Sequence, residues 1–236
     1  MKRHFGKWLA AAVLAVGCTT LTAGAFTDTT GHWAESAINK WSQEYGIIQG
    51  YDDGTFRPDN SITRGAFAGI LDRFLHFQET SPASTFSDTA GTYWEDAILK
   101  LHASGVYLGN QGKALSASTI TRQQAVTMIA RAFALGETEG DIPYDDAGDV
   151  AYYAKGYLVT MLKNGWLNDM GESRLLRPNE PITRAEVVNI LSNLVSRLWQ
   201  ESGEYSEDVT GTAMVSAGDG VILHAMKIDG DLIIAP

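Results

Sequence analysis

Cysteine is nearly absent from this chain, and basic side chains are outnumbered. The 236 residues include one Cys, and 18 Lys and Arg stand against 28 Asp and Glu, for a net charge of −10. A single Cys excludes an internal disulfide, which a chain of this length does not need in order to bury a core. The acidic balance argues against binding DNA, RNA or anionic lipid through a basic surface. An acidic ligand would therefore need a local cluster of Arg.

Long apolar runs are lacking as well. The run "WLAAAVLAVG" is short for a membrane span, follows the basic residues Lys2, Arg3 and Lys7, and precedes the small residues "AGA" at 23–25. This pattern predicts a secretory signal at 1–25 and no transmembrane span in the mature chain. Cys18 lies in "AVGC", which partly resembles a lipoprotein cleavage box, but Ala15 stands where such boxes prefer Leu. An ordinary signal is therefore favoured over a lipoprotein, and we expect a secreted protein.

Motifs for catalysis and metal binding are missing too. We find no phosphate loop, no Ser elbow and no His–Glu zinc motif. The polar loop "GYDDGTFRPDNSITR" at 50–64 fails the EF-hand spacing, because aligning Gly54 with the EF-hand Gly leaves Tyr51 at a ligand position. Asp52 and Asp53 are neighbours in a turn, where such residues usually serve the turn. We expect no metal, no cofactor and no catalytic residue.

What the sequence does contain is a repeat. "SITR", "TITR" and "PITR" recur at 61–64, 119–122 and 181–184, and "FTD", "FSD" and "YDD" recur upstream at 26, 86 and 144. An aromatic residue and then a Gly stand between them in each copy: Trp33 and Gly46, Trp94 and Gly105, Tyr153 and Gly165. Three ordered landmarks in three copies indicate repeats at 26–82, 83–142 and 143–200.

Each copy is predicted to form a helix, a loop and a second helix. In the first copy Trp33, Ala37, Trp41 and Tyr45 are spaced by four, and the Gly that follows suits a helix end. After each ITR, apolar residues lie 4, 7, 8 and 11 places beyond the Thr: Phe67, Ile70, Leu71 and Phe74; Ala125, Met128, Ile129 and Ala132; Val187, Ile190, Leu191 and Leu194. One amphipathic pair cannot bury its own face, so the three copies should share one core in a mainly α fold.

The Thr of each ITR stands where a helix N-cap belongs. We expect Thr63, Thr121 and Thr183 to be the N-caps of the second helices. "TRAE" in the third copy is a complete capping box, and "TRQQ" in the second keeps Gln124 at the third helical position. "TRGA" in the first copy has Ala66 there, which predicts a weaker cap.

The Arg of each ITR is harder to explain, because a cation at the first helical position faces the positive end of the helix dipole. Arg64, Arg122 and Arg184 all accept that cost. One explanation is an internal ion pair, for example with Asp28, Asp88 or Asp146. The other is an anion site, in which the guanidinium and free backbone N–H groups bind one carboxylate or phosphate. The residues alone leave both open.

The repeats resemble the S-layer homology (SLH) family. The resemblance rests on "FTDTTGHWAESAI", "GIIQGYDDGTFRPDNSITR", "FSDTAGTYWEDAI" and "PNEPITRAEVV", and it covers about residues 26–199 in three copies. It implies a pseudo-threefold helical assembly that attaches exported proteins to the bacterial cell wall. The implied ligand is a secondary cell-wall polysaccharide, often carrying a pyruvate ketal, in grooves between repeats.

That resemblance implies a ligand role for Arg64, Arg122 and Arg184, since a planar guanidinium can bind a ketal carboxylate with two hydrogen bonds. Asp28, Asp88 and Asp146 match an acidic position of the family and would bind sugar hydroxyls or cap the first helices. The copies depart from one another: the second has "GNQGKALSAST" and lacks the "DGTFRP" loop. We therefore expect grooves of unequal affinity.

The C-terminal tail at 201–236 differs from the repeats. "AMVSAGDGVILHAMKIDGDLIIAP" has β-rich runs broken by Gly–Asp turns, which resembles the first one or two rungs of a β-solenoid. One rung cannot bury itself. The tail would then continue into further chain, pack on the helices, or add a strand to a partner protein.

The function predicted from these features is non-catalytic anchoring of an exported protein to the cell wall. Expected partners are a secondary cell-wall polysaccharide or a peptidoglycan-linked glycan, with a protein partner for the tail, and no nucleic acid. The expected location is the cell wall or S-layer. The alternative is a secreted or lipid-anchored enzyme that uses the SLH repeats as its wall anchor and carries an active site without a known motif.

Overall fold

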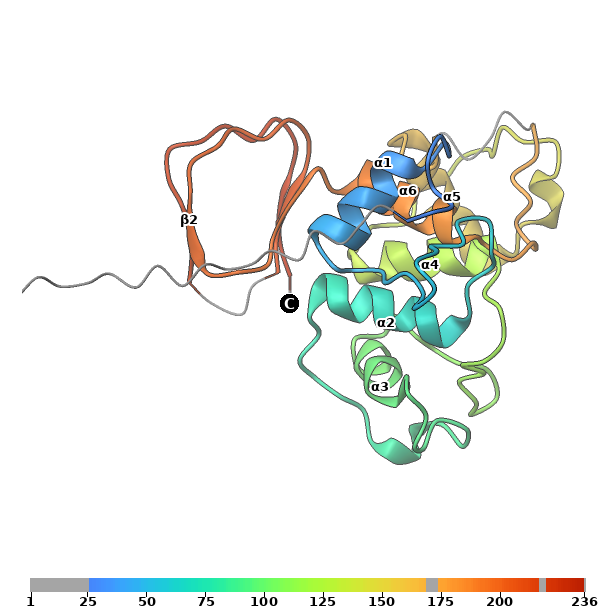
Figure 1. Ribbon diagram of the computed structural model, residues 1–236. Coiled ribbons are helices and arrows are strands. Elements are labelled where there is room, and N and C mark those ends of the chain that lie inside the picture. The colour runs from blue at the N-terminus through green and yellow to red at the C-terminus, as the bar shows by residue number, and fades with distance from the viewer. Residues whose placement is uncertain (1–25, 169–173, 217–219, 236) are drawn as a thin grey trace, which may run out of the picture.

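Helices dominate most of the protein, and short strands form its C-terminal part (Figure 1). The computed structural model describes residues 26–168, 174–216 and 220–235, so the predicted signal at 1–25 and its Cys18 lie outside the described residues. The longer helices are α2 (Arg64–Leu75), α3 (Glu95–Ala103), α4 (Arg122–Ala132), α5 (Tyr152–Lys163) and α6 (Arg184–Leu194). The short ones are α1 (Glu35–Ile38), the π-helix η1 (Asn39–Glu44) that continues it, and the 3₁₀ turns η2 (Ala83–Thr85) and η3 (Ala147–Asp149). The predicted mainly helical fold is confirmed.

The helices pack across the repeats. Each of α1, α3 and α5 lies in the first half of a copy, and each of α2, α4 and α6 in the second half. Helix α3 packs on α2, α5 on α4, and α1 on α6, so the first helix of every copy lies against the second helix of another. The apolar stripes predicted after the ITR segments line the shared core; Ala132 alone among them is only partly buried.

The start of the first copy differs from the predicted helical stripe. Trp41 is fully buried, but Trp33 lies before α1 and its surface is 51% exposed. The reason is that turns precede the helix: the N–H of His32 donates to Thr29 O and that of Glu35 to His32 O. The π-helical turn, in which the Tyr45 N–H reaches Lys40 O at 3.1 Å, also breaks the four-residue spacing.

Trp33 and Trp94, used above as landmarks of the first two copies, do not occupy equivalent positions. Glu35 and Glu95 each accept the N–H of a Gly four residues earlier, which aligns Trp33 with Tyr93 and not with Trp94. Trp94 instead packs on α2, where a Cβ built on Gly65 or Gly69 would lie 2.4 Å from its ring. Two small residues one turn apart thus allow this indole to approach the helix backbone closely.

The three ITR segments meet and exchange backbone hydrogen bonds in a cycle. The N–H of Ile62 donates to Ile182 O, that of Ile182 to Ile120 O, and that of Ile120 to Ile62 O, at 3.0–3.2 Å. Each copy therefore uses its ITR to contact both of the others. All three hydrogen bonds join residues of different copies, so no copy can form them by itself.

The C-terminal part of the chain winds into successive turns built from short parallel strands, and this part is called the coil below. Strands β1 (Arg197–Trp199), β3 (Ala213–Val215) and β5 (Leu232–Ile234) form one sheet, and β2 (Gly203–Tyr205) pairs with β4 (Val221–Leu223) in another. All of these pairings are parallel and stack successive turns of the chain (Figure 1). Strand β1 begins at Arg197, inside the range predicted for the third repeat, because its pairing with β3 makes it part of the coil.

The coil packs on the helices, one of the outcomes expected for the tail. Leu198 and Met214 are buried in the same core as the helices. Around them the N–H of Leu198 donates to the Tyr45 hydroxyl at 3.4 Å, and the Lys40 ammonium donates to Val195 O at 2.8 Å. Apolar burial and these polar contacts join the two parts of the molecule.

Candidate functional site

The three ITR arginines all reach into the loop of another copy. Arg64 Nε donates to Ala114 O at 3.2 Å, and Arg184 Nε donates to Phe56 O at 2.8 Å. Arg122 Nη1 donates to Leu176 O at 3.2 Å. These carbonyls occupy matching places, eight residues before the Arg of their own copy. Part of each guanidinium therefore ties one repeat to the next.

Arg122 and Arg184 are buried, with relative exposures of 2% and 7%. Arg122 Nη2 forms an ion pair with Glu186. Arg184 Nη2 donates to Gln49 O at 2.7 Å, and its guanidinium lies 4.4 Å from the Phe56 ring centroid. Burial lowers the pKa of Arg184 from its usual value. Neither guanidinium has an open face toward solvent.

Arg64 differs because it is only partly buried. Its guanidinium lies 4.9 Å from the centroid of the buried Tyr107 ring, and its Nη1 is 3.4 Å from the Gln124 amide oxygen. The guanidinium also interacts with the Tyr107 hydroxyl, and within the described part of the chain no other hydrogen bond of its Nη2 is present. This arginine therefore keeps donor capacity for a ligand.

The three aspartates hold the loops into which the arginines reach. Both carboxylate oxygens of Asp28 accept backbone N–H groups, from Phe56 at 2.8 Å and Arg57 at 2.7 Å. Asp88 accepts from Ala114 and Leu115, and Asp146 from Leu176 and Arg177, in the same way. The second residue of each pair has positive φ: Arg57 at 56°, Leu115 at 57° and Arg177 at 54°. The carboxylates thus stabilise a strained backbone that non-glycine residues rarely adopt.

The pKa values of two of these carboxyl groups reflect that role. Burial acts to raise the pKa of Asp28 and of Asp88, but the N–H groups that they accept outweigh it, so both pKa values lie below the usual one. Two of the alternatives left open by the sequence are not observed: within the described residues these aspartates form no ion pair with the ITR arginines, and they do not cap the first helices. The internal ion pair of Arg122 is made with Glu186 instead.

A Thr with an extended backbone conformation stands at the N-cap of each second helix. The Thr63 hydroxyl accepts the Ala66 N–H, and the Thr183 hydroxyl accepts the Glu186 N–H, both at 3.2 Å. The Glu186 carboxylate in turn accepts the Thr183 N–H at 2.9 Å, which completes the capping box. In the second copy Gln124 accepts the Thr121 N–H at 3.2 Å, while the buried Thr121 hydroxyl has no partner among the described residues.

The helix starts do not offer free N–H groups to an anion, which corrects that part of the anion-site hypothesis. The N–H groups of Arg64 and Gly65 donate to Ser118 O and Ser116 O of the second copy. The same bonds occur at the other two helix starts: Arg122 and Gln123 to Glu180 O and Pro178 O, and Arg184 and Ala185 to Asn60 O and Pro58 O. Because a loop of another copy covers each helix start, only the guanidinium side chains remain for a ligand.

A groove of about 550 Å³ opens beside Arg64. Its walls come from the second-copy loop (Leu108, Gly109, Asn110, Leu115), from α4 (Gln124, Thr127, Met128, Arg131) and from Tyr153 at the start of α5. It contains two arginines, and no Asp or Glu is among the described residues that line it. In a chain with a net charge of −10, this lining is unusual and favours an anion.

The groove lies in the copy whose loop seemed to be missing. The second copy does have the loop backbone, because Asp88 holds it and Leu115 has the same positive φ as its counterparts. Its side chains are smaller: Ala114 stands where the other copies have Phe56 and Leu176. The sequence departs in these side chains and not in the backbone, and beside Arg64 the ring of Tyr107 lies where Phe56 lies beside Arg184.

Sequence reasoning missed two residues of this groove. Arg131 lies on the last turn of α4, 5.7 Å from the Tyr157 ring centroid, and Tyr153 is 42% exposed. Arg131 stands ten residues after Thr121, where the first copy has Arg73. The shared spacing could have drawn attention to both arginines. It could not show that Arg131 lines the groove while Arg73 donates to Ile47 O at 2.8 Å.

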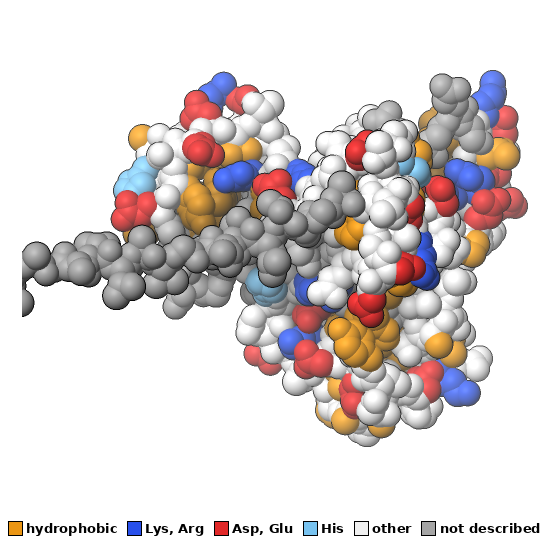
Figure 2. Space-filling model, viewed as in Figure 1, with side chains coloured by type: hydrophobic (Ala, Val, Ile, Leu, Met, Phe, Trp, Pro, Cys, Tyr) orange, Lys and Arg blue, Asp and Glu red, His pale blue; other side chains and the backbone are white. Residues whose placement is uncertain are grey.

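Two further properties bear on the class of protein. No helix within the described ranges is long and apolar enough to cross a membrane. Over the same residues, no cluster of three or more His, Cys, Asp and Glu side chains could hold a metal ion. On the face in Figure 2, Lys and Arg are interspersed with Asp and Glu. These features describe a mostly helical repeat protein with an anion-favouring groove between copies.

Comparison with known proteins identifies the repeats. The S-layer homology domain family matches residues 25–68 and 143–188, and the second copy lies between the two matches. The chain therefore contains S-layer homology domains at these two regions.

Its relatives include proteins of the cell surface. The cellulosome-anchoring protein of Acetivibrio thermocellus is 27% identical over 78% of this chain and 43% of that protein. The surface-layer 125 kDa protein of Lysinibacillus sphaericus is 29% identical over 65% of this chain and 13% of that protein. The amylopullulanase of Thermoanaerobacterium thermosulfurigenes is 25% identical over 73% of this chain, but the match covers 10% of the enzyme. The chain thus spans less than half of each of these relatives.

Proposed function

We propose that this protein anchors to the bacterial cell wall by binding an acidic secondary cell-wall polysaccharide, and that it does so without catalysis. The S-layer homology domains and the surface-layer and anchoring relatives support the location at the cell surface. The observation that carries the ligand class is the groove beside Arg64, which has two arginines and no acidic side chain in its described lining.

The three copies, in this proposal, form one pseudo-threefold assembly at 26–82, 83–142 and 143–200, with a β-solenoid segment after it. The cyclic hydrogen bonds among Ile62, Ile120 and Ile182 support this arrangement. So does the packing of every first helix on the second helix of another copy. A ligand between copies would then bind to a framework in which both walls are fixed.

Arg64 is the proposed carboxylate contact, and Arg131 contributes a second positive charge. The partial exposure of Arg64, and the Nη2 that its contacts with Ala114 O and Gln124 leave over, fit a charge-assisted hydrogen bond to a carboxylate such as that of a pyruvate ketal. Arg122 and Arg184 share the same sequence position, but their guanidinium groups are buried among carbonyls and rings. For these two, a ligand role would require the loops to open.

The six residues predicted to bind ligand thus contribute unequally in this proposal. Asp88 acts as a positioning residue, because it holds the N–H groups of Ala114 and Leu115 in the groove wall. Asp28 and Asp146 hold the matching loops of the other copies. Affinity for the polymer therefore depends mainly on the groove beside Arg64.

Co-sedimentation with purified walls tests this proposal. The protein is mixed with walls that retain the polysaccharide, with walls stripped of it, and with walls whose acidic substituents have been removed. We expect binding to the first only, and loss of that binding in Arg64→Ala. Arg174→Ala is the matched control, because Arg174 is an exposed arginine whose ion pair with Asp145 lies outside the groove. Equal binding of Arg64→Ala and wild type would overturn the site, and binding to stripped walls would overturn the ligand.

A further inference from the structure

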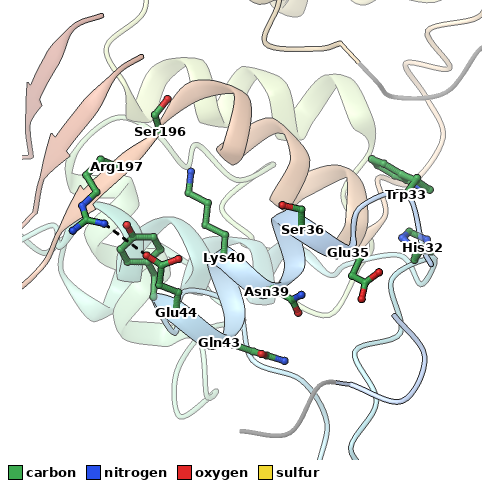
Figure 3. Close-up of a pocket in the computed structure, with 11 residues that line it drawn as sticks. His32, Trp33, Glu35, Ser36, Asn39, Lys40, Gln43, Glu44, Ser196 and Arg197 are labelled. Carbon is green, nitrogen blue, oxygen red and sulfur yellow. Dashed lines mark ion pairs between the residues drawn. The ribbon is translucent and has the colours of Figure 1, made fainter. Parts of the chain in front are cut away.

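A second groove runs along the first helix of the protein, where the helices meet the coil (Figure 3). It has a volume of about 1110 Å³ and is open to solvent along its length. One wall is formed by α1 and η1 and the other by Ser196 and Arg197. Trp33 and His32 lie at one end, and Glu44 and Arg197 at the other (Figure 3). It shares no lining residue with the groove beside Arg64.

Uncharged polar side chains line the helix wall. Ser36, Asn39 and Gln43 are spaced by three and four residues, so they share one face of the helix. Over the described part of the chain these three side chains make no hydrogen bond. The Asn39 amide oxygen is also screened from solvent, so it has neither a protein partner nor ready access to water. An oxygen screened from water is screened from a ligand as well, so the exposed Ser36 hydroxyl and Gln43 amide are the groups on this wall that a ligand can reach.

The charges in this groove are largely engaged within the protein. The Lys40 ammonium donates to Val195 O at 2.8 Å, and burial lowers its pKa to about 8. Arg197 and Glu44 form an ion pair at 4.0 Å. The Glu35 carboxylate accepts the Gly31 N–H at 2.9 Å. The groove is therefore balanced in charge, unlike the one beside Arg64, and it does not favour a strongly anionic ligand.

Trp33 offers an exposed aromatic surface at the end of the groove. Its surface is 51% exposed, and the centroids of its indole and of the His32 ring lie 5.4 Å apart. An exposed indole face provides an apolar surface for the C–H groups of a ring-shaped ligand, and adjacent amides and hydroxyls pair with the hydroxyls of the same ligand.

The π-helix adds an independent observation. Within the described ranges η1 is the one π-helical segment, and the corresponding helices α3 and α5 are regular. It begins at Asn39 and includes Lys40, Gln43 and Glu44, so it sets the direction of most of the helix wall. Single π-helical turns are rare and frequently occur at functional sites.

From these features we infer that the groove between α1–η1 and Ser196–Arg197 binds an uncharged stretch of a glycan chain. Trp33 would stack on one sugar ring, while Ser36 and Gln43 bind hydroxyl or acetamido groups of the next ones. The site goes beyond the carboxylate contact at Arg64: it takes sugar units without a charge, on another face of the helical part.

The test uses wall polysaccharide whose acidic substituents have been removed chemically, titrated onto the full chain by calorimetry. We expect the wild-type protein to keep measurable binding to this neutral polymer. Trp33→Ala should weaken it at least tenfold and Gln43→Ala several-fold. Both side chains are exposed, so thermal unfolding should show that these variants fold as the wild type does.

Tyr93→Ala is the matched control, because Tyr93 is the structural counterpart of Trp33 in the second copy, is 82% exposed and lies outside the groove. It should bind the neutral polymer as the wild type does. Arg64→Ala should also keep this binding while losing the acidic polymer, so the two sites fail separately. If the neutral polymer does not bind the wild type, or binds Trp33→Ala equally well, the inference is wrong.

Discussion

The surroundings of Arg64 and Arg122 show how one sequence position can take two roles. Both arginines begin a helix after an ITR Thr, and both donate to a carbonyl in the loop of the next copy. Around Arg122 the space is filled by Leu176 and Glu186, and the guanidinium is 2% exposed. Around Arg64 the counterparts are Ala114 and Gln124, the Tyr107 ring lies 4.9 Å from the guanidinium, and a groove opens on its other side.

The difference teaches that the motif itself does not define a ligand site. Two residues of the neighbouring copy decide whether the Arg is buried or open. One is the loop residue eight places before that copy's own ITR Arg, and the other is the third residue of its second helix. A large apolar residue and a Glu make the Arg structural, because they bury and neutralise it. A small residue and a Gln leave its charge uncompensated and partly open, which is what an anionic ligand requires.

The largest expected effect is on stability at Arg122. Replacing Arg122 with Ala would leave the buried carboxylate of Glu186 without its main partner, which typically costs about 3–5 kcal/mol. Arg177, 3.7 Å from the same carboxylate, should keep the cost toward the lower end. Urea unfolding monitored by circular dichroism would measure it. An unfolding free energy within about 0.5 kcal/mol of wild type, as typical for surface changes, would show that the ion pair does not hold the copies together.

The second prediction concerns a variant that makes the surroundings of Arg64 resemble those of Arg122. Gln124→Glu places a carboxylate beside Arg64, as Glu186 stands beside Arg122. The new negative charge should reduce affinity for the acidic polymer at least tenfold, about 1.4 kcal/mol, while a Glu can still accept the Thr121 N–H as Gln124 does. Surface plasmon resonance on immobilised polymer would measure the affinity. Unchanged affinity would mean that Arg64 does not carry the contact.

The third prediction concerns acid stability. Because the pKa of Asp88 is lower in the folded state than its usual 3.8, its carboxylate stabilises the fold above about pH 4, and this contribution is lost as the pH falls through the lowered value. Asp88→Asn should therefore be less stable than wild type at pH 7 and lose less stability between pH 4 and 2. Denaturant unfolding across this range would show it. The exposed Asp52, replaced by Asn, is the control, and equal acid dependence of Asp88→Asn and wild type would contradict the account.

The smallest expected effects are at the N-caps. Thr63→Ala removes one bond to the Ala66 N–H and should cost about 1 kcal/mol. Thr183→Ala also disturbs the reciprocal bond from Glu186 and should cost a few tenths of a kcal/mol more. Thermal unfolding of the two variants side by side would compare them. A larger loss for Thr63→Ala would contradict the difference between the caps.

Local features of the fold could be predicted from the sequence because neighbouring residues determine them. The apolar stripe of each second helix, the Thr caps, and the Gly at the helix ends follow from spacing of three, four and seven residues. Gly46, Gly105 and Gly165 do have positive φ of 66°, 71° and 73°. The strand runs of the tail were visible for the same reason.

The candidate site could be predicted only in part, since it is made by residues far apart in sequence. That Arg184 lies on Phe56, or Arg64 on Tyr107, depends on which loop covers which helix, and no local pattern contains that information. The loop of the second copy was misjudged because its side chains differ while Asp88 keeps its backbone. The groove along α1 and η1 could not be predicted because its second wall, Ser196 and Arg197, is far from these helices in sequence.

The central claim is that Arg64 binds the wall polymer whereas Arg122 holds the repeats together. Titration of the acidic polymer onto two folded variants tests it most directly. In Arg122→Met/Glu186→Gln the buried ion pair is replaced without leaving a lone charge, and the Gln keeps an acceptor for the Thr183 N–H. We predict wild-type affinity for this variant and at least a tenfold loss for Arg64→Met. The opposite pattern, with binding lost in the double variant and kept in Arg64→Met, would contradict the account.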